Sequence, residues 1–481
     1  MTDITGLKKN FFPIHFLDSF LRWKWWACAA AAFGAASVAV LGLKGLAIAF
    51  GLVGAGIIVF EIIRAPWKGV IIIAFVLPFE RFGSLEVSGF TIRASQVILG
   101  VTLLVTIAYA LAGKIRFRFR GVHIPLALFF IGALLAFPHA LNPFRAATTI
   151  AFMAFTATLA FLLPTLLVDK KKIERVIQSL LVGAIVTSAF GLFQFAGDLA
   201  GLPQSITGLR DLYSKDVFGF PRIQSTALEP LYFANYLLLP IAISIVSLIR
   251  RQRTLVPYAV VLLPLALPVF VLTLSRAAYI AMAFLVLIMA IALFRRVIRP
   301  SYVVLGIVLI VLTIFVVMYA LSLTGDQTVS IEAFTRQATD LFGGASFADR
   351  ASTVSQATEL IKLNPMGVGP GNFGPAVAIH PRVEPTGGWL IVNNIYFEVL
   401  AEEGILGLLG FLALCVYVVF ASLRTYWQEK DALLQSLLLA VGAAFVAILA
   451  QYMTFSILYI VHIWFCIGLA LTLSKSFSKK V

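Results

Sequence analysis

Apolar runs of about 17 to 23 residues recur along the chain from Trp25 to Ser474, and short basic clusters separate them. Runs of this length are what an α-helix needs to cross the hydrocarbon core of a bilayer. We count about fourteen such runs, and twelve to fourteen spans fit the pattern. The weakest candidates are a Gly/Ala-rich pair near 25–63 and the short run 69–79, which also suits a re-entrant or tilted piece. The pattern predicts an all-α, polytopic integral membrane bundle.

Composition narrows the class further. Hydrophobic residues make up 61% of the 481 residues and charged residues only 12%, with a mean hydropathy of +0.99. A water-soluble globule of this size needs far more polar surface than this chain offers. Composition therefore excludes the soluble classes and leaves a membrane protein.

The distribution of basic residues predicts an orientation. If the N-terminus is cytoplasmic, the segments on that side hold 25 of the 37 Lys and Arg residues. These segments are 8–24, 64–68, 114–120, 170–175, 250–253, 295–299, 424–430 and 475–480. The bias follows the positive-inside rule, so it accounts for the net charge of +15 without nucleic acid as a partner. We expect both termini to be cytoplasmic and membrane lipids to be the partners of the basic segments.

The chain start and the cysteines predict no further special chemistry. Basic residues within 8–24 precede an Ala-rich run without a cleavage pattern, so we expect the first span to remain in the protein. Cys28, Cys415 and Cys466 all fall inside apolar spans, where a thiol behaves as a small hydrophobe. Neither a disulfide framework nor a metal site is expected.

Two long connections interrupt the spans on the predicted outer side. The expected organisation is spans in 1–197, an outer loop 198–228, spans in 229–323, a large outer loop 324–392, and spans in 393–481. Within the large loop, DRASTVSQATELIKLNP has helical spacing and an Asn-Pro end, so we predict a helix there. The following MGVGPGNFGP has the composition of a turn. Long loops on a membrane scaffold are where function tends to lie.

Two arginines are candidates for anion binding. Arg276 follows Ser275 in LTLSRAAYIAM, at the outer edge of a span, and Arg222 lies in the outer loop within FGFPRIQST. An Arg at the membrane edge costs several kcal/mol unless it is paired or reaches the interface, so function is the first reading and an interface anchor the alternative. Two guanidiniums on one face suit a pyrophosphate, because each offers a planar fork of donors and keeps its charge.

Several carboxylates have two readings each. Glu229 directly precedes Pro230 at the start of a span, where it is either a helix N-terminal charge or a partly buried general base. Glu398 and Glu402 are four residues apart and share one helix face, with Glu403 beside them. Solvated acids at a helix start are the alternative for these three.

The segment from Asn393 resembles the O-antigen ligase and polymerase superfamily. The ligase pattern is His, then Asn, Ser or Gln, nine residues, Gly, two residues, and Gly, Thr or Tyr. Here Asn393 stands at the His position, Asn394 at the second, and Gly404 and Gly407 at the two later positions. Three further blocks look like family segments in the same order: FPRIQSTALEPLYFANYLLL (220–239), LSRAAYIA (274–281) and RASTVSQATELIKLNPMGVGPGNF (350–373).

The resemblance implies a transferase on the outer, periplasmic face of a bacterial inner membrane, with a fold of the lipid-dependent glycosyltransferase type. Such enzymes join a glycan carried on undecaprenyl pyrophosphate to an acceptor hydroxyl, without a nucleotide sugar, metal or other cofactor. By position, Arg222 and Arg276 would hold the pyrophosphate. Arg350 and Asn394 would position the acceptor or the loop.

Asn393 departs from the family pattern, because a neutral amide cannot take a proton. General-base assistance is typically worth about 10² to 10⁴ in rate, so we expect another base or another reaction. The candidates are, in order, Glu229, His380 and one of Glu398, Glu402 and Glu403. Asn393 can still orient the acceptor through hydrogen bonds. The departure favours a polymerase of O-antigen or exopolysaccharide units over a ligase acting on lipid A core, and a transporter of lipid-linked glycan is the non-enzyme alternative.

Overall fold

The computed structural model describes most of the chain from residue 51 onward. The described residues are 51–81, 85–87, 90–117, 121–214, 220–322, 345–385, 388–456, 458 and 460–474. The first expected span, with Cys28, and residues 324–344 of the large loop lie outside them. The chain forms two compact units, 1–66 and 67–481. In the first unit, residues 51–64 form a helix in which Arg64 and Glu61 make an ion pair of 3.9 Å.

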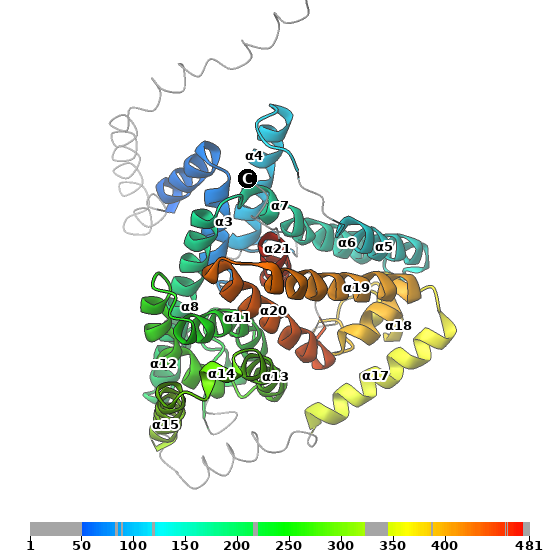
Figure 1. The fold of residues 1–481 in the computed structure, drawn as a ribbon. Helices are drawn as coiled ribbons and strands as arrows, with labels where there is room; N and C mark the ends of the chain where they lie inside the picture. Colours follow the sequence, from blue (N-terminus) through cyan, green and yellow to red (C-terminus); the bar gives the residue numbers. More distant parts are fainter. Residues whose placement is uncertain are drawn as a thin grey trace, which may run out of the picture. The chain divides into compact units, whose positions relative to one another are not determined.

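The second unit is built from helices (Figure 1). In chain order they are α3 (Trp67–Val76), α4 (Ala94–Leu111), α5 (His123–Ala136), η2 (Phe137–His139), α6 (Pro143–Ala157), α7 (Leu159–Leu166), α8 (Lys170–Leu199), α9 (Gln204–Thr207), η3 (Asp211–Tyr213), α11 (Pro230–Ile249), α12 (Val256–Leu272), α13 (Arg276–Ala292), α14 (Phe294–Val297), α15 (Pro300–Ser322), α17 (Ala345–Leu363), α18 (Phe373–Val377), α19 (Ile395–Gln428), α20 (Ala432–Gln451), η4 (Tyr452–Thr454) and α21 (Val461–Leu473). A short antiparallel hairpin, β1 (Leu85–Val87) and β2 (Phe90–Ile92), pairs Leu85 with Ile92.

The predicted polytopic helical membrane protein is confirmed. In the described part of the chain, seven helices are long and apolar enough to cross a membrane, and five apolar helices are shorter. One of the shorter ones is α3, whose ten residues are too few to span a bilayer alone. The helix predicted in the large loop is also confirmed, because α17 ends at Leu363, just before Asn364 and Pro365.

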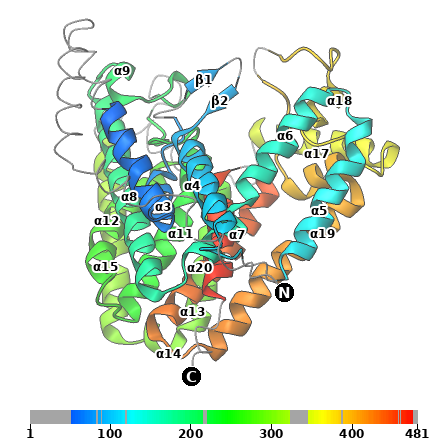
Figure 2. The same ribbon diagram turned by 90° about the horizontal axis from the view of Figure 1, so that it is seen from above.

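Burial separates central helices from peripheral ones. In the most apolar 18-residue stretch of α11, 83% is buried inside the protein. In the corresponding stretch of α15 only 6% is buried, although its mean hydropathy is higher. The side chains of α15 therefore face lipid, which costs nothing for apolar groups. Figures 1 and 2 both show α15 beside α12 at the margin of the second unit. The loops that carry the candidate residues are attached to the central helix α11 and its neighbours.

Glycines allow α5 and α19 to pack closely. A Cβ built on Gly132 of α5 would collide with the backbone nitrogen of Gly407, and one on Gly410 would collide with the backbone nitrogen of Phe129. Small residues permit such approach between membrane helices, where van der Waals contact drives association. Gly407 is one of the two motif glycines, so part of the sequence pattern serves helix packing.

We expect Gly132→Ala to destabilise the protein by about 1–3 kcal/mol, because the new methyl group would push α5 away from α19. The measurement is thermal unfolding of the purified protein in detergent. Gly306→Ala in α15 is the matched control, since its Cβ would meet no atom within 4 Å in the described part of the chain. Equal melting temperatures for both variants would contradict the close packing.

Candidate functional site

The junction between α12 and α13 positions Arg276. α12 ends at Leu272, and Leu274 has φ of 51°, a left-handed conformation that is unfavourable for a leucine. This sharp turn puts Ser275 at the N-cap position of α13, without a capping bond from its side chain, and places Arg276 as the first residue of the helix. Arg276 is partly buried there. A strained turn of this kind persists only where surrounding contacts hold it.

Arg222 supplies those contacts. Its Nε and Nη2 donate to the carbonyl oxygen of Thr273 at 3.3 and 3.2 Å, and Nη2 also donates to that of Leu274 at 3.3 Å. The next residue, Ile223, donates its N–H to the Leu272 oxygen at 3.1 Å. The last carbonyls of a helix lack intrahelical donors and carry partial negative charge, so a guanidinium is a suitable partner. Arg222 thus fixes the turn that presents Arg276.

Three guanidiniums form what we call the arginine cluster: Arg222, Arg276 and Arg350. Burial lowers the pKa of Arg222, and the positive charge of Arg276 lowers it further. Burial also lowers the pKa of Arg350, again with a contribution from Arg276. Arg276 therefore lies within electrostatic reach of both other arginines, which come from the 220–229 segment and from α17. Like charges held together in this way favour a multiply charged anion.

Glu229 lies beside this cluster, at the N-cap of α11. Burial raises the pKa of Glu229, and the charges of Arg210 and Arg222 partly offset that rise. Arg210 Nη1 also donates to the Leu228 oxygen at 3.2 Å, next to Glu229 in the chain. Tyr213 stacks on Arg222, with 5.7 Å between the guanidinium carbon and the ring centroid. Glu229 is thus a half-buried carboxyl among cations, the environment of an adjustable proton acceptor.

Glu80, in the loop that follows α3, supports the same segment, and the sequence pattern does not reveal it. It accepts a hydrogen bond from the Leu228 N–H at 3.2 Å and is 6% exposed. Burial raises the pKa of Glu80, with Arg93 acting in the opposite direction. Gln194 of α8 also holds the segment, because its Oε1 accepts from the Ser225 N–H at 2.9 Å. The loop after α3 and helix α8 therefore both hold the 220–229 segment in place.

Asn393 and Asn394 shape the start of α19. Asn394 is the N-cap, and its Oδ1 accepts from the N–H groups of Tyr396 and Phe397 at 3.1 and 3.3 Å. Asn393 has φ of 57°, a region that asparagine tolerates, and donates its N–H to Ser456 Oγ at 2.9 Å. The structure thus gives Asn394 a helix-capping role.

Helix α17, which carries Arg350, is hydrogen-bonded to the residue that precedes Asn393. Thr353, one turn after Arg350, donates its hydroxyl to the oxygen of Val392 at 2.8 Å. The same hydroxyl lies 3.0 Å from the oxygen of Arg350. The residue at the family histidine position is therefore linked to α17 through its immediate neighbour.

The glycine turn after α17 docks on a break in α19. Gly404 has φ of 71° and ψ of −172°, which interrupts the helix. The N–H groups of Val368 and Gly369 donate to the oxygens of Ala401 and Glu402, both at 2.9 Å. A Cβ on Gly404 would lie 2.6 Å from the carbonyl oxygen of Met366. The first motif glycine is therefore required by backbone conformation and by close contact.

The side chain of Glu402 completes that turn. Its two carboxylate oxygens accept from the N–H of Gly371 at 2.6 Å and from that of Phe373 at 2.8 Å. Arg145 of α6 donates Nε to the Gly371 oxygen at 2.5 Å. The predicted turn is confirmed over 366–372, whereas residues 373–375 belong to α18. Glu402 is one of the groups that hold this turn.

Glu398 and Glu403 line a small cavity of about 40 Å³ together with Glu402 and Arg145. Glu398 accepts from the Val392 N–H at 3.0 Å. Glu403 is 3% exposed, and among the described residues its Oε2 has no hydrogen-bond partner. Glu402 and Glu403 are therefore buried and Glu398 is partly buried, so these acids are not the solvated helix-start residues of the alternative reading.

His380 lies in the connection between α18 and α19. It is exposed after α18, and the oxygen of the following Pro381 accepts from Asn142 Nδ2 at 3.5 Å. These contacts place its segment beside the start of α6. They do not bring it to Glu229 or to the arginine cluster.

The sequence pattern did not predict a buried polar network that lies between the central helices. Asn235 Nδ2 donates to Gln451 Oε1 at 2.9 Å, and Asn235 Oδ1 lies 2.7 Å from His462 Nε2. All three residues are at most 5% exposed. They join α11, α20 and α21, and buried polar groups paired in this way fix the register of the helices.

Comparison with protein families identifies the central part of the chain. Residues 259–412 match the O-antigen ligase family model. The match confirms the predicted resemblance and supports the O-antigen ligase and polymerase superfamily. It includes Arg276, Arg350 and Asn393, whereas Arg222 and Glu229 lie before it. Comparison with curated proteins gives no match. O-antigen ligase or polymerase-type activity on lipid-linked glycans is the general function that this match supports.

Glu402→Gln should lower the thermal stability of the protein. An amide can accept only one of the two N–H bonds, and leaving a buried donor unsatisfied costs about 1–3 kcal/mol. The measurement is the melting temperature in detergent, with Glu359→Gln, an exposed side chain of α17, as control. An unchanged melting temperature for Glu402→Gln would show that the carboxylate does not hold the glycine turn.

Proposed function

We propose that this protein is a membrane glycosyltransferase that polymerises lipid-linked O-antigen or exopolysaccharide repeat units on the periplasmic face of the inner membrane. The observation that carries the proposal is the arginine cluster, in which Arg276 lies within electrostatic reach of Arg222 and of Arg350, two arginines from other segments of the chain. Two of these arginines fall within the family match. The bias of basic residues supports cytoplasmic termini and a periplasmic position for the cluster.

In this account the arginine cluster binds the pyrophosphate of undecaprenyl pyrophosphate. Arg276 and Arg350 contact phosphate oxygens, and Arg222 contributes charge while holding the α12–α13 turn. Negative charge builds on the pyrophosphate as the glycosidic bond breaks. Fixed guanidiniums stabilise that charge without reorganising, and this is how electrostatic preorganisation lowers a barrier. Undecaprenyl pyrophosphate departs with the electron pair of the broken bond.

Glu229 is the proposed base. The acceptor hydroxyl oxygen forms a bond to the anomeric carbon of the donor, and the hydroxyl proton passes to the Glu229 carboxylate. Its raised pKa and its position beside Arg222 support this role. Glu398 and Glu402, in contrast, already accept backbone N–H groups. Asn393, at the start of α19, orients the acceptor by hydrogen bonding.

The choice of polymerase rests on Asn393, since the amide replaces the histidine of the ligase pattern. The second candidate is a ligase that transfers the glycan to lipid A core. The printed description of the matching family, O-antigen ligase, favours this alternative.

Product length distinguishes the two reactions. Purified protein supplied only with a lipid-linked repeat unit should yield a ladder of longer chains. Arg276→Gln should lose the ladder while staying folded, because the leaving-group charge is no longer stabilised; the expected loss is about 10² or more. Arg382→Gln, an exposed arginine after α18, is the control and should keep the ladder. Transfer only after lipid A core is added would identify a ligase, and full activity of Arg276→Gln would remove the pyrophosphate role.

The pH dependence tests Glu229. A carboxyl accepts a proton only when it is ionised, so the rate should fall as the pH drops through the raised pKa of Glu229. The acidic limb should therefore lie above the usual range of a glutamate. Glu229→Gln should remove that limb and lower turnover at least about tenfold. Glu384→Gln, exposed in the same part of the chain as His380, should leave the profile unchanged. A wild-type acidic limb in Glu229→Gln would assign the base elsewhere.

A further inference from the structure

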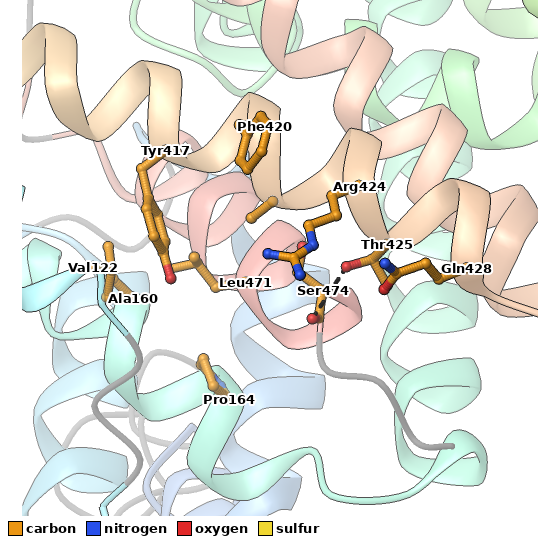
Figure 3. Close-up of a pocket in the computed structure, with 11 residues that line it drawn as sticks. Val122, Ala160, Pro164, Tyr417, Phe420, Arg424, Thr425, Gln428, Leu471 and Ser474 are labelled. Atoms are coloured by element: carbon orange, nitrogen blue, oxygen red, sulfur yellow. Dashed lines mark hydrogen bonds between the residues drawn. The ribbon is translucent and has the colours of Figure 1, made fainter. Parts of the chain in front are cut away.

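A groove of about 320 Å³ is lined by the C-terminal part of α19 and by three neighbouring segments. Its walls come from the start of α5, from α7, from the last turns of α19 and from the end of α21. Its volume falls in the range of small-molecule sites, about 300 to 1,000 Å³. Figure 3 shows the side chains around it. The groove is far along α19 from Asn393, so it is separate from the proposed transfer site.

One part of the groove is apolar. Ala160 and Pro164 of α7 lie across the groove from Phe420 of α19, with Leu471 of α21 between them (Figure 3). Ala421 of α19 also lines this part. A surface of this kind, open on one side and set among membrane helices, suits a hydrocarbon chain. Each methylene that it buries from water is worth about 0.8 kcal/mol.

The other part of the groove is polar and cationic. Arg424, Thr425, Gln428 and Ser474 line it, and Figure 3 shows the guanidinium of Arg424 directed toward Ser474. Thr425 Oγ1 donates to the Ser474 oxygen at 3.3 Å, which joins α19 to the end of α21. Among the residues that the structure describes, no carboxylate forms an ion pair with Arg424. A guanidinium beside amide donors is well suited to a phosphodiester.

The surrounding surface places the groove at the edge of the bilayer. Phe420, Leu423 and Trp427 are 60%, 54% and 76% exposed, so this face of α19 is turned toward lipid. Trp427 lies one turn after Leu423, and tryptophan concentrates at the level of the headgroups. Arg424 is adjacent to that level, where its long side chain can reach a headgroup phosphate.

α7 adds a second polar feature. Pro164 lies inside this helix and has no N–H to donate to the carbonyl of Ala160, one turn earlier. Both residues line the groove.

We propose that this groove is a binding site for one anionic phospholipid of the leaflet at this end of the protein. One acyl chain lies against Ala160, Phe420 and Leu471, and the headgroup phosphate is bound by Arg424 and Gln428. The site is distinct from that of the lipid-linked glycan. Lipid binding at this site depends on the positive charge of Arg424 in the polar part of the groove and on the free volume in its apolar part.

Native mass spectrometry of the delipidated full-length protein tests the proposal. Dioleoyl phosphatidylglycerol and dioleoyl phosphatidylcholine are added separately, and bound lipid is counted. Wild type should bind one phosphatidylglycerol more tightly than phosphatidylcholine. Arg424→Gln should weaken phosphatidylglycerol binding about fivefold, the effect of one basic residue near an anionic lipid. Arg296→Gln in α14, an exposed arginine at the same end, is the matched control and should bind like wild type.

A second variant tests the apolar part. Ala421→Trp fills the groove and should reduce binding of the lipid while leaving Arg424 in place; Ala421→Leu replaces it if the larger side chain prevents folding. Equal phosphatidylglycerol binding by wild type, Arg424→Gln and the filled variant would overturn the proposal. Displacement of the lipid from wild type by glycerol 1-phosphate alone would also overturn it, because the site would then recognise free phosphate.

Discussion

The contact between the Arg222 guanidinium and the carbonyls of Thr273 and Leu274, which directly follow α12, is the constraint on which the site depends. Those carbonyls have no helical donors, and the chain must turn sharply at Leu274 before α13 begins. The charged hydrogen bonds from Arg222 satisfy the carbonyls and hold the turn. Arg276 then starts α13 beside a second guanidinium. Arg222 thus fixes the backbone of this turn and also adds to the positive electrostatic potential that a bound anion would experience.

A second constraint connects the two halves of the site. The break of α19 at Gly404 frees carbonyls that receive the glycine turn, and Glu402 closes the turn from the side. α17 is tied to the same region through Thr353 and Val392. Arg350 and Asn393 are therefore carried by segments that hydrogen bonds hold to one another. In the proposed reaction this rigidity keeps the leaving-group cations and the acceptor position in fixed relation.

Features that depend on residues close together in the sequence were predictable, and features that depend on contacts between distant segments were not. The membrane spans and α17 follow from apolar length and helical spacing, and their existence was predictable. The motif glycines were visible too, but the reasons for them were not, because Gly132 and Met366 approach them from distant segments. The acids of α19 looked like solvated helix-start residues, yet Glu402 binds backbone groups about thirty residues earlier in the chain. Glu80 and the Asn235–His462 pair gave no local signal, since their partners lie far away in sequence.

The most direct test of the account is a density map of the protein with bound undecaprenyl pyrophosphate. The account predicts the pyrophosphate between Arg276 and Arg350, close to Arg222 and within reach of Glu229. Pyrophosphate density elsewhere, for example beside Arg145 and the cavity of Glu403, would contradict it.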